Sequence, residues 1–161
     1  MAEKLLEVKN LKTCFKLFRG TVKAVDGVSF SVDKGEILGL VGESGGGKSV
    51  TGFSLLGLID PPGKVHEGEV LFHGEDLLKK SYDEMRHIRG KEIAMIFQDP
   101  MTSLNPLQTV GQQIDEALRL HTKLSSKDRL ARSIELMSEV GIPNPEERLK
   151  NYPHQFSGGM R

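Results

Sequence analysis

The 161-residue sequence has little of several features that mark particular classes of protein. Its single cysteine, Cys14, cannot form a disulfide within the chain, and no Cys-x-x-Cys pair or His/Cys cluster indicates a structural metal. Its 22 basic and 22 acidic residues cancel, which gives no electrostatic reason to expect nucleic acid as a partner. No apolar run approaches the roughly 18 residues of a membrane-spanning helix, and the charged start Met1-Ala-Glu-Lys is not a secretory signal. We therefore expect an ordinary globular chain suited to a reducing compartment.

What the sequence does have is a glycine-rich stretch, Gly42-Glu-Ser-Gly-Gly-Gly-Lys-Ser49, between an apolar run at 37–41 and an apolar helical pattern from Val50 to Ile59. This is the pattern G-x-x-x-x-G-K-[ST] in the strand, loop and helix setting that is typical of a P-loop. Glycines suit such a loop because its backbone N–H groups must point inward at phosphates, where side chains would crowd them. A glycine-rich turn without a ligand could match the same eight residues by chance, but the setting on both sides favours the P-loop.

The residue types of this stretch predict a site for a nucleoside triphosphate. The helix after the loop offers its N-terminal amides and the positive end of its dipole to a phosphate. Lys48 is the only side-chain cation of the loop and can reach the β- and γ-phosphates, while the Ser49 hydroxyl can ligate Mg²⁺. The residues expected to contact the nucleotide are Gly42, Glu43, Ser44, Gly45, Gly46, Gly47, Lys48, Ser49 and Val50.

The hydrophobic pattern predicts an α/β fold with a β-rich front and a helical back. Alternation of apolar and polar residues at 5–11 and 28–32 predicts two half-buried strands, and residues 69–72 predict a third. The apolar runs at 37–41 and 93–97 predict two buried strands. The front of the chain is thus expected to combine a small antiparallel β-layer with a parallel one.

Capping signals predict the helices. Ser81 with Glu84, and Thr109 with Gln112, have the spacing of a capping box at a helix N-terminus. Ser126 is expected to open a further helix, and Pro145 a short last one. Four apolar residues of the helix after Ser126 are expected to share one face: Leu130, Ile134, Met137 and Val140. We expect an α/β core with a β-subdomain over residues 1–106 and an α-helical subdomain over residues 107–161.

Two further segments have the order and spacing of one family. Ile96-Phe97-Gln98-Asp99-Pro100 resembles the Q-loop of ATP-binding cassettes, and Phe156-Ser157-Gly158-Gly159-Met160 resembles their signature motif, usually Leu-Ser-Gly-Gly-Gln. Together with the P-loop, they make the chain resemble the ATP-binding subunit of an ABC transporter. Phe156 and Met160 depart from the commonest letters of the signature, while its Ser-Gly-Gly core is intact.

The resemblance implies roles for these segments that complete the nucleotide site. It implies that Gln98 reaches the Mg²⁺ and the attacking water, so that Lys48 and Gln98 act in catalysis. It also implies that Ser157, Gly158 and Gly159 face the γ-phosphate held by a second subunit, so that two subunits enclose two ATP molecules head to tail. Without the P-loop, a glutamine at a strand end would be only a solvated side chain, and Ser-Gly-Gly an ordinary flexible turn.

The family also places an aromatic residue under the adenine ring, upstream of the P-loop. The resemblance favours Phe15 for this role, since an aromatic face can stack on a base. Cys14 occupies the neighbouring position and Phe18 lies close by in the sequence. A phenylalanine that belongs to the core at a strand end would fit the same pattern.

Three stretches, Ala24–Phe30, Gly39–Ser44 and Gln98–Pro106, resemble the ATPase subunits of bacterial dipeptide and oligopeptide importers. Importers of nickel or glutathione share such stretches, which leaves the cargo open. The resemblance implies a protein at the cytoplasmic face of the cell membrane, bound to transmembrane permease subunits and to a second ATP-binding subunit, and served indirectly by a peptide-binding protein. A soluble cassette ATPase of DNA repair or translation is disfavoured, because it would be expected to carry long insertions or basic patches.

In that family the chain continues beyond the signature to an acidic pair, called Walker B, and to a switch histidine, whereas this sequence ends at Arg161. We therefore expect this chain to bind ATP but to hydrolyse it poorly or not at all, with turnover restricted to a full-length form. An ATP-binding fragment without turnover is the alternative function. The absent part would supply strands to a central sheet, so the chain is expected to expose strand edges and apolar surface.

Overall fold

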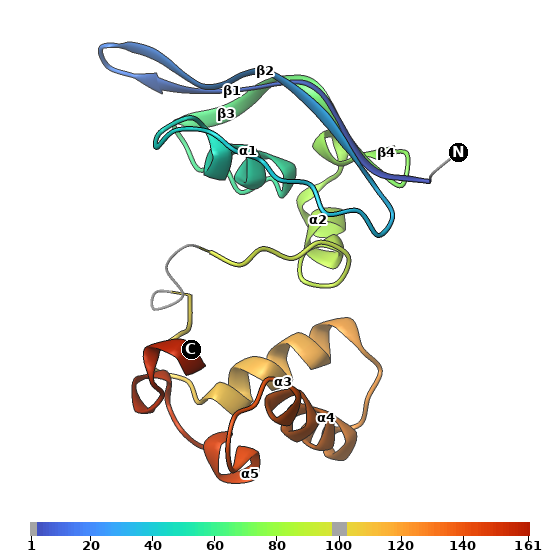
Figure 1. The fold of residues 1–161 in the computed structure, drawn as a ribbon, viewed down its shortest axis with the longest axis vertical. Helices are drawn as coiled ribbons and strands as arrows, with labels where there is room; N and C mark the ends of the chain where they lie inside the picture. The colour runs from blue at the N-terminus through green and yellow to red at the C-terminus, as the bar shows by residue number, and fades with distance from the viewer. Residues whose placement is uncertain (1–2, 98–102) are drawn as a thin grey trace. The chain divides into compact units, whose positions relative to one another are not determined.

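The computed structural model describes residues 3–97 and 103–161 (Figure 1). The chain forms two compact units, Met1–Ile93 and Ala94–Arg161. All strands of the described residues belong to the first unit, and the described part of the second unit has helices as its only regular elements. This β-rich front and helical back are the fold class that the sequence predicts, whereas the domain boundary after residue 106 stays a prediction.

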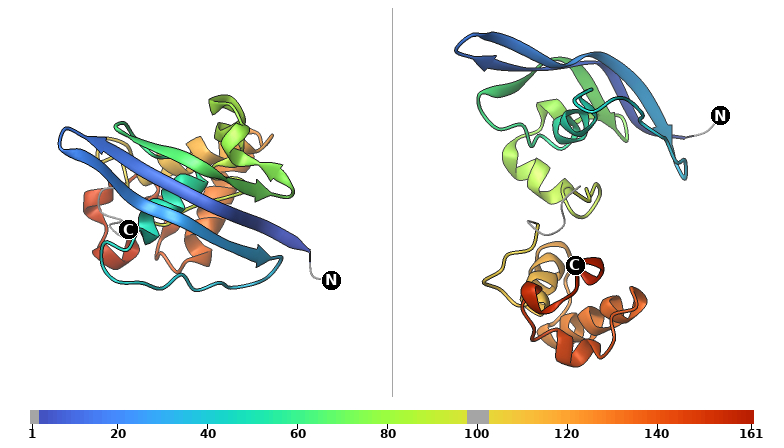
Figure 2. Two further views of the ribbon diagram at one scale, coloured as in Figure 1. Left: turned by 90° about the horizontal axis from the view of Figure 1, so that it is seen from above. Right: turned by 60° about the vertical axis from the view of Figure 1, so that its left-hand side comes forward.

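The first unit is built on an antiparallel sheet with the strand order β2-β1-β3-β4. Figure 2 shows the three long strands side by side, with β1 in the middle. The pairing continues past the alternation at 5–11 and 28–32, because register shifts such as the one between Val8 and Leu11 interrupt the alternation without ending the ladder. The strands are β1 (Lys4–Leu17), β2 (Gly20–Asp33), β3 (Gly63–Phe72) and β4 (Glu75–Asp76).

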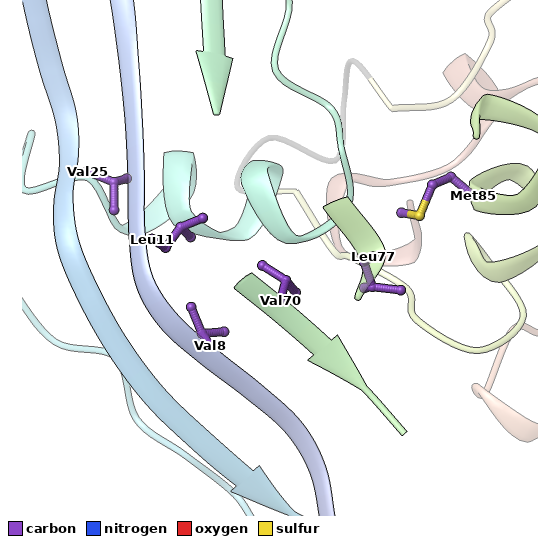
Figure 3. Packing of buried hydrophobic residues seen from close by; sticks show 6 residues of the cluster. All are labelled: Val8, Leu11, Val25, Val70, Leu77 and Met85. Carbon is purple, nitrogen blue, oxygen red and sulfur yellow. The ribbon is translucent and has the colours of Figure 1, made fainter. Parts of the chain in front are cut away.

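The core of the first unit lies between the sheet and the helices that cover it (Figure 3). Helix α1 (Lys48–Leu55) is tied to β1 by a hydrogen bond of 2.7 Å between the hydroxyls of Thr13 and Ser54, both completely buried. Ser54 also donates to Val50 O, so Thr13 is the donor of the pair, and neither buried hydroxyl lacks a partner. The buried apolar side chains around them are Val8, Leu11, Val25, Val70, Leu77 and Met85.

Helix α1 ends at Leu55, earlier than the pattern to Ile59 predicts. Gly57 has a φ of 61°, in the left-handed region that closes a helix. Leu58 N donates to Phe53 O at 2.8 Å, and Gly57 N donates to Ser54 O at 3.2 Å. These two bonds make a Schellman motif, which satisfies the last carbonyls locally and stops the helix before the prolines at 61 and 62 are reached.

A short 3₁₀ turn and a helix follow the sheet, each with its own cap. Helix α2 (Tyr82–Ile88) begins at the predicted capping box of Ser81 and Glu84. The turn η1 (Leu77–Lys79) is capped by Asp76, whose carboxylate accepts from Val70 N at 3.2 Å and Leu78 N at 3.1 Å. Burial raises the pKa of Asp76, but the Lys79 ammonium at 3.0 Å and these two amides outweigh it and hold that pKa below its usual value.

The two apolar runs predicted as buried strands are not strands in this structure. Residues 37–41 form no ladder with any described residue, and Ile37 and Val41 are 98% and 90% exposed. Within residues 93–97, the β-pairing among described residues is limited to an isolated bridge between Ile93 and Arg89. A strand exists through hydrogen bonds to a neighbour, and the described residues offer these runs no neighbouring strand. The exposed apolar surface is therefore as expected, while the parallel layer is not formed.

The second unit packs its helices around a small core. Helix α3 begins at the predicted capping box of Thr109 and Gln112. Helix α4 begins at Ser126, as predicted, and its N-cap is Ser125, whose hydroxyl accepts from Asp128 N. The helices are α3 (Val110–His121), α4 (Ser126–Glu139) and α5 (Pro145–Arg148), with 3₁₀ turns η2 (Pro153–Gln155) and η3 (Gly158–Met160).

The apolar face of α4 is only partly covered. Met137 is buried against Leu149 and Phe156, the other members of the core of this unit. Leu130 and Val140 are 56% and 74% exposed. The 3.6-residue period therefore predicts the helix correctly but not the extent to which its apolar face is buried, which depends on the length and placement of the neighbouring helices.

Candidate nucleotide-binding site

The glycine-rich stretch forms a loop that leads directly into the N-terminus of α1. Gly47 is the N-cap of the helix, with a φ of 82° in the left-handed region. A Cβ at this position would lie 2.2 Å from Ala24 O on β2. Only glycine permits both this backbone conformation and this close approach. The loop is thus anchored on the sheet at the point where the helix begins.

Lys48 closes over the loop that precedes it. Its ammonium donates to Gly42 O and to Glu43 O, each at 2.7 Å. Lysine has three N–H donors, and the third makes no hydrogen bond to a residue that the structure describes. The half-buried cation therefore spans the curled backbone and keeps one donor for a ligand.

The first turn of α1 presents backbone donors without acceptors. Thr51 N bonds to Gly47 O at 2.8 Å, which is the first hydrogen bond of the helix. The amides before it, of Lys48, Ser49 and Val50, have no acceptor among residues 3–97 and 103–161. Since the helix dipole adds positive potential at this end, the turn is suited to an anion. Ser49 is exposed beside these amides, where its hydroxyl can reach a bound ligand.

The loop contains one contact that the sequence pattern does not identify. The Thr51 hydroxyl donates to Gly47 O at 2.9 Å, and Thr51 is 3% exposed. Gly47 O thus accepts from both the amide and the hydroxyl of Thr51, which fixes the peptide that joins loop and helix. The sequence feature that could have predicted this contact is the threonine four residues after Gly47. At that spacing in a helix, a threonine hydroxyl can donate to the carbonyl four residues before it.

Phe15 lies in β1, paired with Val22 on β2 and Gly63 on β3. A Cβ at Gly63 would come within 2.5 Å of Phe15 Cε1, so the ring lies directly over the Gly63 backbone. This packing is what a phenylalanine of the core at a strand end would show. The stacking of Phe15 on an adenine ring stays a prediction. Phe18, the neighbouring aromatic, is fully exposed at the turn between β1 and β2.

The residues expected to form the signature are at the start of η3 in the second unit. Ser157, Gly158 and Gly159 are all exposed, and Ser157 O accepts from Met160 N at 3.1 Å. Phe156, immediately before them, is 5% exposed and belongs to the core of the unit. A phenylalanine in place of the usual leucine therefore serves as an apolar anchor, from which the serine and glycines project into solvent.

The predicted site residues are thus only partly brought together. Residues 42–50 form one continuous loop and helix start, while Phe15 belongs to the same unit and Ser157–Gly159 to the other. Gln98 lies outside the described residues. No group of three or more His, Cys, Asp or Glu side chains in the described ranges could hold a metal ion. A cation at this site would need oxygen ligands from Ser49 and from a bound phosphate.

The loop, the start of α1 and the fold define a P-loop nucleotide-binding domain. The comparison with known families identifies the family to which this domain belongs. Residues 25–161 match the model of the ABC transporter family. This is most of the chain, and the chain belongs to that family. The resemblance carried by the P-loop, Gln98 segment and Ser-Gly-Gly core is thereby confirmed.

Within this family the chain is similar to ATP-binding proteins of peptide transport. It is 55% identical over 159 residues to the oligopeptide transport ATP-binding protein OppD of Bacillus subtilis, with 98% of this chain and 44% of the relative covered. It is 56% identical over 160 residues to the dipeptide transport ATP-binding protein DppD of the same organism, covering 99% and 48%. The Escherichia coli DppD is 51% identical over 156 residues, covering 97% and 48%. The chain spans about half the length of these curated relatives.

Solved structures of ATP-binding cassettes share the fold. The dimeric cassette MJ0796 has a TM-score of 0.82 and 25% identity, covering 96% of this chain and 64% of that one. Its post-hydrolysis dimer bound to ADP and Pi has a TM-score of 0.78 and 26% identity, with the same coverage. Among the residues described here, no helix has the length and apolar character needed to cross a membrane.

Proposed function

We propose that this chain binds MgATP and forms part of the ATP-binding subunit that drives import of dipeptides or oligopeptides. The observation that carries the proposal is the P-loop itself, where the Lys48 ammonium and the amides of 48–50, which have no acceptor in the described part of the chain, converge at the start of α1. The names of the similar proteins support the choice of peptides as cargo. An importer of nickel or another small solute is the alternative cargo within the same family.

The residues of the loop have distinct tasks in this proposal. The amides of Lys48, Ser49 and Val50 donate hydrogen bonds to phosphate oxygens, and Gly42 to Gly47 provide the room for the phosphates to approach. Lys48 adds a charge-assisted hydrogen bond through its remaining donor. Ser49 and, by resemblance, Gln98 ligate Mg²⁺, which neutralises the phosphate charge and orients the terminal phosphate.

Hydrolysis and transport belong to the whole protein in this proposal. A second ATP-binding subunit, either identical or a paralogue, places its Ser157–Gly159 segment against the γ-phosphate held by the first. The dimeric cassettes of similar fold support such a pair. The pair acts at the cytoplasmic face of the membrane on two permease subunits, and a peptide-binding protein delivers the cargo to those permeases.

The test is calorimetric titration of MgATP into the wild-type chain and two lysine variants. Lys48→Ala removes the only side-chain cation of the loop, and we expect a large loss of affinity for MgATP. A charged hydrogen bond contributes about 1.5–3 kcal/mol, or roughly a tenfold to hundredfold change in affinity. Lys64→Ala is the matched control, since Lys64 is an exposed lysine of β3 for which the structure shows no ion pair with a described residue. Unchanged affinity in Lys48→Ala would contradict the proposal.

A further inference from the structure

Arg89 connects the end of α2 to the end of the P-loop helix. It is the C-cap of α2, and its backbone amide bonds to Met85 O at 2.9 Å. Its side chain crosses to α1, where Nε donates to Leu56 O at 2.7 Å and Nη2 donates to Gly57 O at 3.0 Å. A guanidinium whose two donors engage two consecutive carbonyls forms a charged contact of fixed geometry. One side chain of α2 therefore engages the C-terminal end of α1.

The neighbours of Arg89 are arranged to permit this contact. A Cβ at Gly57 would lie 3.0 Å from the guanidinium Nη2, so glycine leaves the space through which the fork reaches the carbonyls. The Tyr82 ring lies 5.7 Å from Arg89 Cζ on the first turn of α2 and contributes a cation–π contact. Arg89 is half-buried, so part of its surface is removed from water together with its partners.

Helix α1 is consequently fixed at its start, in its last turn and just beyond its C-terminal end. Gly47 packs against β2 at the N-terminus, the Thr13–Ser54 hydrogen bond ties the helix to β1, and Arg89 holds Leu56 and Gly57 beyond its last turn. A helix of 8 residues is about 12 Å long. A change in its tilt at one end moves the amides and the lysine at the other end, because the helix between them is rigid.

Arg89 is also the first residue of the segment that follows α2. Arg89 forms an isolated parallel bridge with Ile93, and Gly90 N bonds to Ile93 O at 2.9 Å. Ile93 is the last residue of the first unit. The turn that ends α2 and the C-terminal end of α1 are thus fastened to each other through one guanidinium, within one unit.

We propose that Arg89 is a positioning residue of the nucleotide site, which sets the angle at which α1 presents Lys48 and the amides of its first turn to phosphate. The proposal rests on the function proposed above, namely that this P-loop binds ATP. Arg89 acts through the helix and touches neither nucleotide nor metal. As a cation at the C-terminal end of α1, it also opposes the negative end of the helix dipole.

The test compares Arg89→Ala and Arg89→Lys with Arg86→Ala as control. Arg86 is an exposed arginine of the same helix, with no hydrogen bond or ion pair to a described residue. MgATP affinity is measured at a temperature well below the unfolding midpoint of each variant, so that only folded protein is compared. We expect Arg89→Ala to bind about tenfold more weakly, which corresponds to about 1.4 kcal/mol. Arg89→Lys should recover only part of this loss, because a flexible ammonium can reach the two carbonyls but lacks the planar fork that fixes both bonds in one geometry.

A second readout does not depend on nucleotide. In the ligand-free protein, the ¹H and ¹⁵N shifts of the amides of 48–50 should move in Arg89→Lys and stay unchanged in Arg86→Ala. Wild-type affinity in the folded Arg89 variants, or unmoved amide shifts, would overturn the proposal and leave Arg89 a purely structural residue. If Arg89→Ala does not fold, Arg89→Lys decides by the same two measurements. If the wild-type chain itself does not bind MgATP, the proposed function fails, and the amide shifts alone decide the role of Arg89.

Discussion

Replacing Gly47 by alanine should destabilise the first unit far more than the same change at Gly45. Both residues have a left-handed backbone, with φ of 82° and 79°, so a Cβ at either position costs about 1–2 kcal/mol of backbone strain. At Gly45 the new methyl group meets nothing within 4 Å, whereas at Gly47 it would lie 2.2 Å from Ala24 O. Overpacking of this kind costs about 1–3 kcal/mol more, because the loop must move away from β2.

The expected loss of unfolding free energy is therefore about 2–5 kcal/mol for Gly47→Ala and about 1–2 kcal/mol for Gly45→Ala. The entropic effect of alanine on the unfolded chain is the same in both variants and cancels in the comparison. The difference between the variants isolates the contact with β2. A loss in the upper part of this range would be a large share of the stability of a small unit, which is usually about 5–15 kcal/mol in all.

Urea unfolding in a Tyr152→Phe background measures this difference. The sequence has no tryptophan and two tyrosines, one in each unit, so the fluorescence of Tyr82 then reports on the first unit alone. A lower midpoint with an unchanged dependence on urea concentration would show a true loss of stability. Equal losses in Gly47→Ala and Gly45→Ala would refute the reasoning, because the close approach to Ala24 would then have no energetic consequence.

Two further predictions concern other parts of the fold. Folding lowers the pKa of Asp76 from 3.8. The stability that the ionised carboxylate contributes should therefore be complete above pH 3.8 and fade as the pH falls through the lower pKa of the folded state. Asp76→Asn should flatten this decline in acid unfolding curves. In the second unit, Phe156→Ala should cost about 3–5 kcal/mol of stability, since it empties a buried position beside Met137, whereas Phe156→Leu should cost less than about 1.5 kcal/mol. Denaturant unfolding followed through Tyr152 in a Tyr82→Phe background would measure both variants, and similar losses for alanine and leucine would contradict the burial of Phe156.

Features that depend on neighbours in the sequence could be predicted from the sequence. The sequence predicts the capping boxes at Ser81 and Thr109 because both partners of each box lie within one helical turn. The P-loop was found for the same reason, since residues 42–49 make the whole loop and the glycine spacing reports its backbone conformation. Local chemistry thus predicts both helix starts and the centre of the candidate site.

Features that depend on distant partners could not be predicted in the same way. The run at 37–41 has the composition of a buried strand, but composition does not supply the neighbour that a strand needs. Arg89 gave no signal at all, because its acceptors at Leu56 and Gly57 are more than thirty residues away in the sequence. The role of the site is therefore easier to predict than the contacts that hold it in place.

The exposed run at 37–41 also bears on how long such a chain would survive in a cell. It is uncharged, rich in β-branched and aliphatic residues and unpaired within the described structure, which is the kind of segment that chaperones and proteases engage. A charged substitution at Leu40 would make this run a poorer target for such binding.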